Sequence, residues 1–214
     1  MQLLLESIRV ELPDFEMPLL PFHQQRIQKT QMELWGTANI KDIQKAIKGS
    51  FRPEMHSVDG NNIYKCRLLY HQSGIHDIQW QPYVERQLYS LQLTPAESLE
   101  YPYKYAIRSG IDSLKNSSSA DDILMHRNDL ITDTSYANVA FYNGKDWITP
   151  SRPLLLGVKR AELFEQKKIR AAEISTGQLG DFSEIKLFNA MISANYQYRF
   201  DAQSGLLQLQ KFML

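Results

Sequence analysis

Cysteine is nearly absent from this chain, since Cys66 is the single residue of its type among 214. One thiol cannot form an internal disulfide, and alone it cannot build a thiolate metal site. We therefore expect no metal, and we expect Cys66 to be a small buried residue of a strand. A net charge is also lacking, because 24 Lys and Arg residues balance 24 Asp and Glu residues. Without a basic excess, the composition disfavours a nucleic-acid-binding protein.

Long apolar runs are lacking as well. The longest early run, Leu3 to Leu5, follows no basic residue and is far too short for a signal sequence or a membrane span. We therefore expect a cytoplasmic protein that does not enter the membrane. What the chain does have is an ordinary globular composition, with 43% apolar residues, and a length that suits one large domain or two small ones.

The first ninety residues predict a strand, two helices and a meander of strands, because their apolar residues alternate or recur at spacings of three and four. The first helix begins near Pro21 and ends at Gly36, a typical C-cap. The predicted elements are a strand over 5–10, helices over 21–36 and 40–49, the second capped by Asn39, a hairpin over 64–70 and 76–80, and a strand over 89–93 that continues the meander.

Between residues 94 and 103 the pattern loses its period and contains two prolines, so we place a linker there. It would join an N-terminal α+β domain, residues 1–93, to a C-terminal domain, residues 104–214. The second domain is predicted to have helices over 107–114 and 158–168, strands over 122–125, 130–132, 138–142, 147–149 and 185–188, a two-residue turn at Asn143-Gly144, and an irregular C-terminus. These elements predict the α+β class.

Three features could carry chemistry. Arg26 shares an apolar helix stripe with Ile27 and Leu34, so its guanidinium needs a carboxylate or phosphate partner. That partner could belong to a structural ion pair of the protein or to a bound ligand. Gly157 ends an apolar run at the start of a predicted helix, where free N–H groups can bind an anion or the glycine can merely shape a loop. Lys104 stands between Tyr103 and Tyr105. It could be desolvated among the aromatic rings and so serve as a nucleophilic amine, or it could be an ordinary solvated lysine.

A series of motifs runs through most of the chain. In the first ninety residues, the pattern F-E-T-I-R is resembled by Leu5-Glu6-Ser7-Ile8-Arg9, and the pattern H-x-x-R-L by Phe22-His23-Gln24-Gln25-Arg26-Ile27. In the middle of the chain, K-x-x-N-R is resembled by Lys104 with Arg108, A-D-E by Ala120-Asp121-Asp122, and T-E-x-x-x-x-N-L-F by the segment from Thr132 to Phe141. Towards the C-terminus, L-P-G-I-T-R is resembled by Leu155 to Arg160, and C-N-A-L by Lys186 to Met191. In this order the motifs resemble those of the class IV aminotransferase family, the fold-type IV pyridoxal-phosphate enzymes.

This resemblance implies a two-domain architecture, with a small N-terminal α/β domain and a C-terminal pseudo-barrel domain, and pyridoxal 5′-phosphate as cofactor. It implies that Lys104 is the catalytic residue and binds the cofactor covalently, that Arg26 holds the phosphate, and that Asp133 pairs with the pyridine nitrogen. The cofactor-binding residues would be Arg26, Lys104, Asp133, Leu155, Gly157, Val158, Lys159, Asn189 and Ala190. A homodimer is implied as well.

Within the family, the short chain and Asn189-Ala190 favour a 4-amino-4-deoxychorismate lyase-like enzyme of folate biosynthesis, which forms 4-aminobenzoate and pyruvate. The alternative is an aminotransferase acting on a branched-chain or D-amino acid, and a third reading is a non-catalytic pyridoxal-phosphate-binding protein. Two substitutions depart from the family pattern, since Asp133 replaces a glutamate and Ile107 replaces an asparagine. The given sequence also begins at the F-E-T-I-R-like strand, without the D-R-G-x-x-Y-G-D segment that precedes it in the family.

Overall fold

The computed structural model describes residues 2–52, 62–192, 196–203 and 205–213. The chain forms two compact units, one of Met1–Glu85 with Tyr103–Ile107 and one of Arg86–Pro102 with Arg108–Leu214. The first unit therefore ends before residue 93, where we expected the N-terminal domain to end. The reason is β4 (Ser90–Pro95), which we expected in the first meander and which instead pairs with β5 (Asp122–Arg127) and β12 (Leu206–Met213) of the second unit.

The first unit is built on a three-stranded antiparallel sheet of β1 (Leu4–Glu11), β2 (Ile63–His71) and β3 (Gly74–Pro82), in that order. The hairpin and the first strand are confirmed. Cys66 lies opposite Ile8 on one side and Trp80 on the other, and its side chain is fully buried. Burial raises the pKa of the Cys66 thiol to about 12.

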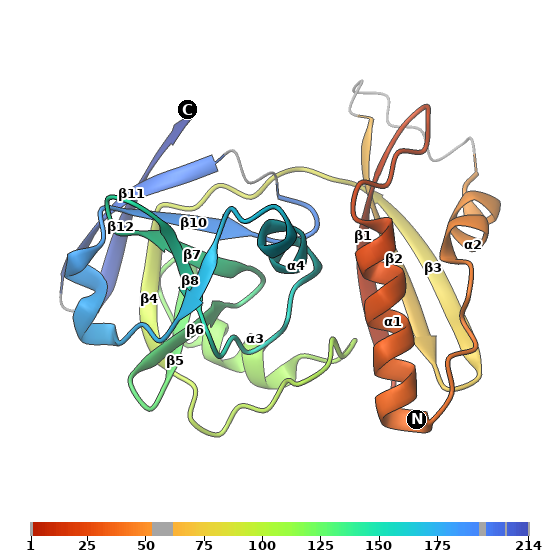
Figure 1. Cartoon of the computed structure of the whole chain (residues 1–214), viewed down its shortest axis with the longest axis horizontal. Coiled ribbons are helices and arrows are strands. Elements are labelled where there is room, and N and C mark those ends of the chain that lie inside the picture. The colour runs from red at the N-terminus through yellow and green to blue at the C-terminus, as the bar shows by residue number, and fades with distance from the viewer. Residues whose placement is uncertain (1, 53–61, 193–195, 204, 214) are drawn as a thin grey trace. The chain divides into compact units, whose positions relative to one another are not determined.

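Two helices accompany this sheet (Figure 1). In α1 (Leu20–Trp35), Pro21 stands in the first turn and Gly36 ends the helix in the left-handed region, with φ of 67°. In α2 (Ile43–Ser50), Asp42 is the N-cap, because its side chain accepts the Lys45 N–H at 2.9 Å. The expected cap at Asn39 is wrong, because Asp42 caps the helix and the Asn39 Oδ1, the atom that a cap would use, accepts Nε2 of Gln31 at 2.6 Å.

The second unit is a nine-stranded sheet in the order β6-β5-β4-β12-β11-β10-β7-β8-β9 (Figure 1). Its remaining elements are α3 (Ser109–Asn116), β6 (Leu130–Thr134), β7 (Asn138–Tyr142), β8 (Trp147–Pro150), α4 (Val158–Glu165), β9 (Arg170–Ala172), the 3₁₀ helix η2 (Thr176–Asp181), β10 (Glu184–Phe188) and β11 (Tyr196–Gln203). Strand β6 stands at one end of this order, yet it also contacts β7 and β8 near the other end. The sheet therefore curls into a partly closed barrel, as the resemblance implied.

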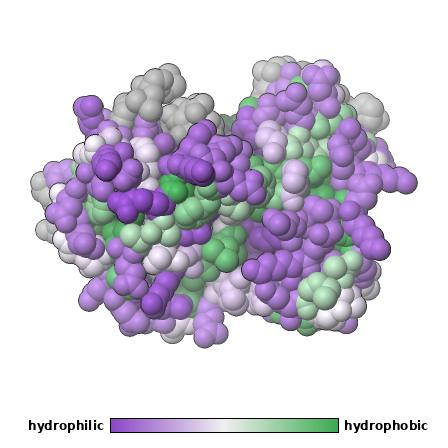
Figure 2. Space-filling view, viewed as in Figure 1, coloured by the Kyte–Doolittle hydropathy of each residue, from purple (hydrophilic) through white to green (hydrophobic). Residues whose placement is uncertain are grey.

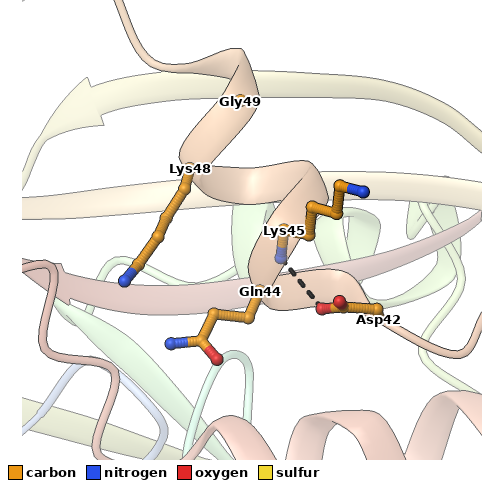
Figure 3. Close-up of a pocket in the computed structure, with 5 residues that line it drawn as sticks. All are labelled: Asp42, Gln44, Lys45, Lys48 and Gly49. Carbon is orange, nitrogen blue, oxygen red and sulfur yellow. Dashed lines mark hydrogen bonds between the residues drawn. The ribbon is translucent and has the colours of Figure 1, made fainter.

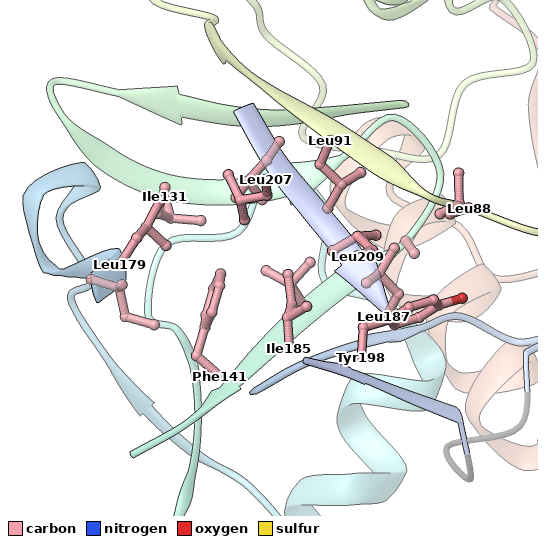
Figure 4. Packing of buried hydrophobic residues seen from close by; sticks show 14 of the residues in the cluster. Leu88, Leu91, Ile131, Phe141, Leu179, Ile185, Leu187, Tyr198, Leu207 and Leu209 are labelled. Atoms are coloured by element: carbon pink, nitrogen blue, oxygen red, sulfur yellow. The ribbon is translucent and has the colours of Figure 1, made fainter. Parts of the chain in front are cut away.

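The inside of this barrel is filled by one large apolar cluster (Figure 4). Phe141 and Ile185 face each other on β7 and β10, and β11 and β12 add Tyr198, Leu207 and Leu209. The irregular C-terminus that we expected is therefore wrong. Leu207 and Leu209 are two residues apart, so both point to the same face of a strand and into the core.

The connection from β7 to β8 also differs from the expectation. A two-residue turn at Asn143-Gly144 was predicted, but the loop runs over residues 143–146. Asn143 stabilises this longer loop, because its side-chain oxygen accepts the N–H groups of Lys145 and Asp146 at 3.0 and 2.8 Å. Gly144 adopts φ of 90°, which suits glycine.

Candidate functional site

In the first unit, three polar side chains meet inside the protein. Glu6 on β1 is fully buried. Its carboxylate accepts a hydrogen bond from Nδ1 of His23 at 2.6 Å and another from Nε of Arg26 at 2.9 Å. Nη2 of Arg26 also donates to this carboxylate, so the guanidinium binds it with two nitrogens. Both His23 and Arg26 come from α1, three residues apart on the stripe that the sequence predicted. The anion that Arg26 was expected to need is thus, in this structure, Glu6.

The charges of this cluster follow from burial and pairing. Burial alone would raise the pKa of Glu6, but Arg26 and His23 outweigh it and hold the pKa at about 2. Burial lowers the pKa of His23, partly opposed by Glu6, and nearby Arg26 and Lys104 lower it further. His23 is therefore neutral at pH 7 and donates its Nδ1 proton to Glu6. Its buried Nε2 has no hydrogen-bond partner among the described residues.

Lys104 lies on a short segment that returns to the first unit beside β1. The carbonyl of Lys104 accepts the N–H of Leu5 at 2.9 Å, and the N–H of Ala106 donates to the carbonyl of Leu3 at 2.9 Å. These bonds fix the half-buried Lys104 next to the strand that carries Glu6. The first unit therefore brings together Arg26 and Lys104, two residues that the sequence singled out separately.

Sequence reasoning missed Glu6 as the partner of Arg26, although a signal was present. Leu4, Glu6, Ile8 and Val10 alternate along β1 and are all buried, so the glutamate lies on the apolar face of the strand. A carboxylate there needs a cationic partner, because an unpaired charge is costly to bury. An acidic residue in phase with the apolar ones could have predicted the pair.

In the second unit, a second buried cluster surrounds Asp133 at the end of β6. Oδ1 of Asp133 accepts Nδ2 of Asn138 at 2.7 Å, and Oδ2 accepts the backbone N–H of Leu155 at 2.9 Å. Burial raises the pKa of Asp133 to about 7, although these two donors and the charge of Arg160 favour the ionised form. A carboxyl with this pKa can change its protonation state near neutral pH, or it can pair with a cation that enters the site.

The loop that follows Leu155 leads into α4. Gly157 is the N-cap residue of α4 and makes no side-chain capping bond, so the N–H groups of the first turn, including Val158 and Lys159, face outward from the start of the helix. This is the place where an anion is favoured. The side chain of Lys159 is paired with Glu162 at 2.5 Å. Lys159 therefore offers its backbone N–H at this position.

Arg160, in the first turn of α4, is buried and was not predicted as a site residue. Its Nη2 donates to the carbonyl of Pro150 at 2.9 Å, and its guanidinium lies 4.6 Å from the ring centroid of Phe164. Burial lowers the pKa of Arg160, opposed by the charge of Asp133. Since a guanidinium stays charged at neutral pH, Arg160 is a fixed positive charge near Asp133.

Asn189 and Ala190 follow β10 in the second unit. Nδ2 of Asn189 donates to the carbonyl of Tyr136 at 3.1 Å, and its Oδ1 accepts the N–H groups of Met191 and Ile192 at 2.8 and 3.0 Å. The side chain of Asn189 therefore shapes the turn after β10. A ligand at this turn would therefore be contacted by the backbone of the turn and by Ala190, which is half-buried.

A surface hollow of about 510 Å³ beside α2 is lined by Asp42, Gln44, Lys45, Lys48 and Gly49, none of which the sequence singled out for chemistry (Figure 3). Hydrophilic residues cover most of the face that Figure 2 shows, on each unit. Within the described residues, no group of three or more His, Cys, Asp or Glu side chains is placed to hold a metal. None of the helices there combines the length and apolar character needed to cross a membrane.

Comparison with known proteins now places the chain. Residues 3–194 match the family model for amino-transferase class IV. An uncharacterized protein of Haemophilus influenzae is 31% identical over 170 residues, which cover 79% of this chain and 88% of that protein. A crystal structure from Haemophilus somnus 129PT, named as a candidate 4-amino-4-deoxychorismate lyase, has 28% identity and a TM-score of 0.76, and the match covers 89% of this chain and 96% of that one.

A more distant match shows the fold alone. It is an aminotransferase from Brucella abortus bound to the cofactor PLP, 16% identical, with a TM-score of 0.63 over 88% of this chain and 78% of that one. The family model covers far more than half of the chain, and the H. influenzae relative exceeds 30% identity over most of it. This chain belongs to the class IV aminotransferase family.

Proposed function

We propose that this protein binds pyridoxal 5′-phosphate and catalyses a 4-amino-4-deoxychorismate lyase-like reaction, which releases 4-aminobenzoate and pyruvate. The main support for this reaction is the 28% identity with the H. somnus protein that is named as a candidate 4-amino-4-deoxychorismate lyase, over nearly the whole of both chains. The lyase-like Asn189-Ala190 pair in the sequence also supports it.

The residues present fit this cofactor. Pyridoxal phosphate needs a partner for its ring nitrogen, a cationic or amide-rich cradle for its phosphate, and an amine. The buried Asp133, with a pKa raised by burial to about 7, suits the ring nitrogen. The start of α4, uncapped by any side chain among the described residues, suits a phosphate. Nε2 of His23, buried and without a hydrogen-bond partner among the described residues, could accept a hydrogen bond from a bound group, since leaving a buried nitrogen unpaired is costly in free energy.

Each proposed residue then has one task. Arg26 holds the phosphate while Glu6 fixes the orientation of its guanidinium. Asp133 would pair with the ring nitrogen and keep it protonated. Lys104 would hold the cofactor through Nζ and move the proton at the substrate Cα. When bound, the cofactor supplies an electron sink for the electrons of the broken Cα–H bond.

The alternative is an aminotransferase acting on a branched-chain or D-amino acid. Membership of the class IV aminotransferase family supports this alternative. It would use the same residues, but it would also need a 2-oxo acid as second substrate. A non-catalytic pyridoxal-phosphate-binding protein is the third candidate, because Asp133 is one methylene shorter than the usual glutamate.

The test is to incubate the cofactor-loaded protein with aminodeoxychorismate and without any oxo acid. The proposal requires repeated turnover to 4-aminobenzoate, and Lys104→Ala, prepared in parallel, should form none. If the substrate is inert and small L- or D-amino acids instead convert the bound cofactor to pyridoxamine phosphate in one turnover, the aminotransferase is correct. Absence of both reactions from a protein that binds the cofactor would favour the non-catalytic candidate.

We also propose that the protein acts as a homodimer in the cytoplasm, as the resemblance implies. Light scattering during size-exclusion chromatography should give about twice the mass of the 24.8 kDa chain. A monomer that retains turnover would refute this part of the proposal without affecting the assignment of the reaction.

A further inference from the structure

Asn138 matches the asparagine of the T-E-x-x-x-x-N-L-F motif, but neither the motif nor the family comparison gives its side chain a role. It stands at the first position of β7 and is only 6% exposed. Its amide nitrogen donates to Oδ1 of Asp133 at 2.7 Å and to the carbonyl of Leu155 at 2.9 Å. Both hydrogens of the amide are thereby used, because both partners are acceptors.

Leu155 closes this arrangement from the other side. Its N–H donates to Oδ2 of Asp133, while its carbonyl accepts from Asn138. The two carboxylate oxygens of Asp133 thus accept from different donors, Oδ1 from Asn138 and Oδ2 from Leu155. These two donor residues are also hydrogen-bonded to each other. A carboxylate bound in this way cannot rotate about its terminal bond without breaking a hydrogen bond. The arrangement therefore fixes both the direction and the plane of the Asp133 carboxylate.

Gly157 provides the independent observation. Its backbone, with φ of −73° and ψ of 146°, is one that any residue adopts, so the conformation does not require glycine. Space does require it. A Cβ at this position would overlap Oδ1 of Asn138 and lie 3.2 Å from its Cγ. Asn138 could move aside only by giving up its bonds to Asp133 and Leu155.

We propose that Asn138 is a positioning residue, which aims the Asp133 carboxylate at the cofactor ring nitrogen, and that residue 157 is glycine because the Asn138 amide occupies the space of a side chain. The role toward the cofactor rests on the proposed function. The packing of Asn138 against Gly157 does not, so the two parts can fail separately.

The packing is tested on the cofactor-free protein with a double-mutant cycle. Gly157→Ala should lower the Tm by roughly 3–10 °C, as expected for an overpacked site in a chain of this size. The same substitution in an Asn138→Ala background should cost almost nothing further, since the obstructing amide is gone. An equal loss in both backgrounds, or no loss in either, would overturn the proposal. If Asn138→Ala does not fold, Asn138→Ser gives the same comparison, because serine also leaves the space beside Gly157 empty.

The positioning role is tested by titrating Asp133 in the cofactor-free protein, with ¹³C-labelled aspartate followed by NMR and Asp133→Asn used for assignment. Asn138→Ala removes a donor to the ionised carboxylate, so the midpoint of Asp133 should shift to higher pH. Asn143→Ala is the matched control, since Asn143 follows the other end of β7 and its side chain accepts the N–H groups of Lys145 and Asp146 within its own loop. It should leave the midpoint unchanged.

An unchanged midpoint in Asn138→Ala would show that Asn138 serves only the fold, and the positioning role would be wrong. In the loaded protein, the pH at which the absorbance of the bound cofactor changes should shift in Asn138→Ala and stay in Asn143→Ala. A protein that binds no cofactor but shows the expected cycle and titration would refute the proposed function while the Asn138 arrangement stands.

Discussion

Replacing Glu6 by Gln should strongly destabilise the first unit at neutral pH. The Glu6 carboxylate is fully buried, and Arg26 and His23 hold its pKa at about 2 against an ordinary value of 4.5. At about 1.4 kcal/mol per pKa unit, this difference corresponds to about 3 kcal/mol of folding free energy. The same size is expected when one partner of a buried ion pair is removed, roughly 3–5 kcal/mol, because Arg26 is left without its anion.

The pH dependence of this loss has a definite sign. The pKa of Glu6 is lower in the folded than in the unfolded state, so its stabilisation is present above about pH 4.5 and is lost as the pH falls through about 2. The difference between wild type and Glu6→Gln should therefore be greatest at pH 6–7 and should shrink from about pH 5 downward. Urea unfolding at several pH values, followed by tryptophan fluorescence, measures it, because Trp35 and Trp80 both belong to the first unit.

Glu11→Gln is the matched control on the same strand. Glu11 accepts Nε of Arg9 at 2.7 Å, but this pair is partly exposed, with side-chain exposures of 23% and 36%. A pair of that kind contributes about 0–1 kcal/mol, so the control should change stability little at any pH. Our reasoning would be refuted by a Glu6→Gln protein as stable as wild type at pH 7, or by a difference that grows as the pH falls.

Three further predictions concern the cofactor. Arg26→Ala should weaken binding of pyridoxal phosphate about ten- to a hundredfold, because a charge-assisted contact of roughly 1.5–3 kcal/mol is lost; equilibrium dialysis with wild-type affinity would mean that Arg26 serves Glu6 alone. Borohydride reduction of the loaded protein followed by peptide mapping should find the label on Lys104, and a label on another lysine would reassign the nucleophile. Asp133→Asn should keep the cofactor but lose most turnover, because the ring nitrogen is no longer held protonated, and equal kcat in the two proteins would contradict this.

Local periodicity predicted the parts of the fold in which one face of an element is apolar. The stripe of α1 and the alternation in β1 and β2 were predicted correctly, because burial on a single face leaves its period in the sequence. The alternation expected in β3 is only partly correct, since Ile78 and Trp80 are half-buried but His76 is exposed. The caps were harder to predict. Asn39 and Asp42 are both good N-cap residues, and the choice between them depends on Gln31 of α1, whose side chain donates to the Oδ1 that Asn39 would need for capping.

The strands that were missed pair over long distances. β12 lies between β4 and β11, so its position depends on a partner more than one hundred residues earlier. Its sequence alternates, with Leu207 and Leu209 buried and Gln208 and Gln210 exposed, but a short alternating segment at the end of a chain gives no indication of its partner. β4 was assigned to the wrong sheet for the same reason.

The candidate site shows the same division between what is local and what is not. Motif order led to Arg26, Lys104 and Asp133, and the anion that Arg26 requires follows from its place on an apolar stripe. The arrangement around Asp133 depends on Asn138 and Leu155, which are 5 and 22 residues away from it. The motif places Asp133 and Asn138 five residues apart, but no period or spacing in the sequence connects them with Leu155 or Gly157. Only the folded chain therefore reveals that the asparagine and the glycine at 157 depend on each other.

The burial of Cys66 in the middle strand of the first sheet gives the protein a natural chemical reporter. Because the sequence contains one cysteine, any reaction with a thiol reagent occurs at one known atom. A fully buried thiol whose pKa is raised to about 12 is almost entirely protonated and shielded at neutral pH, so it should react only when the sheet opens. The rate of labelling in native buffer would therefore measure how often β2 separates from β1 or β3, without any introduced probe.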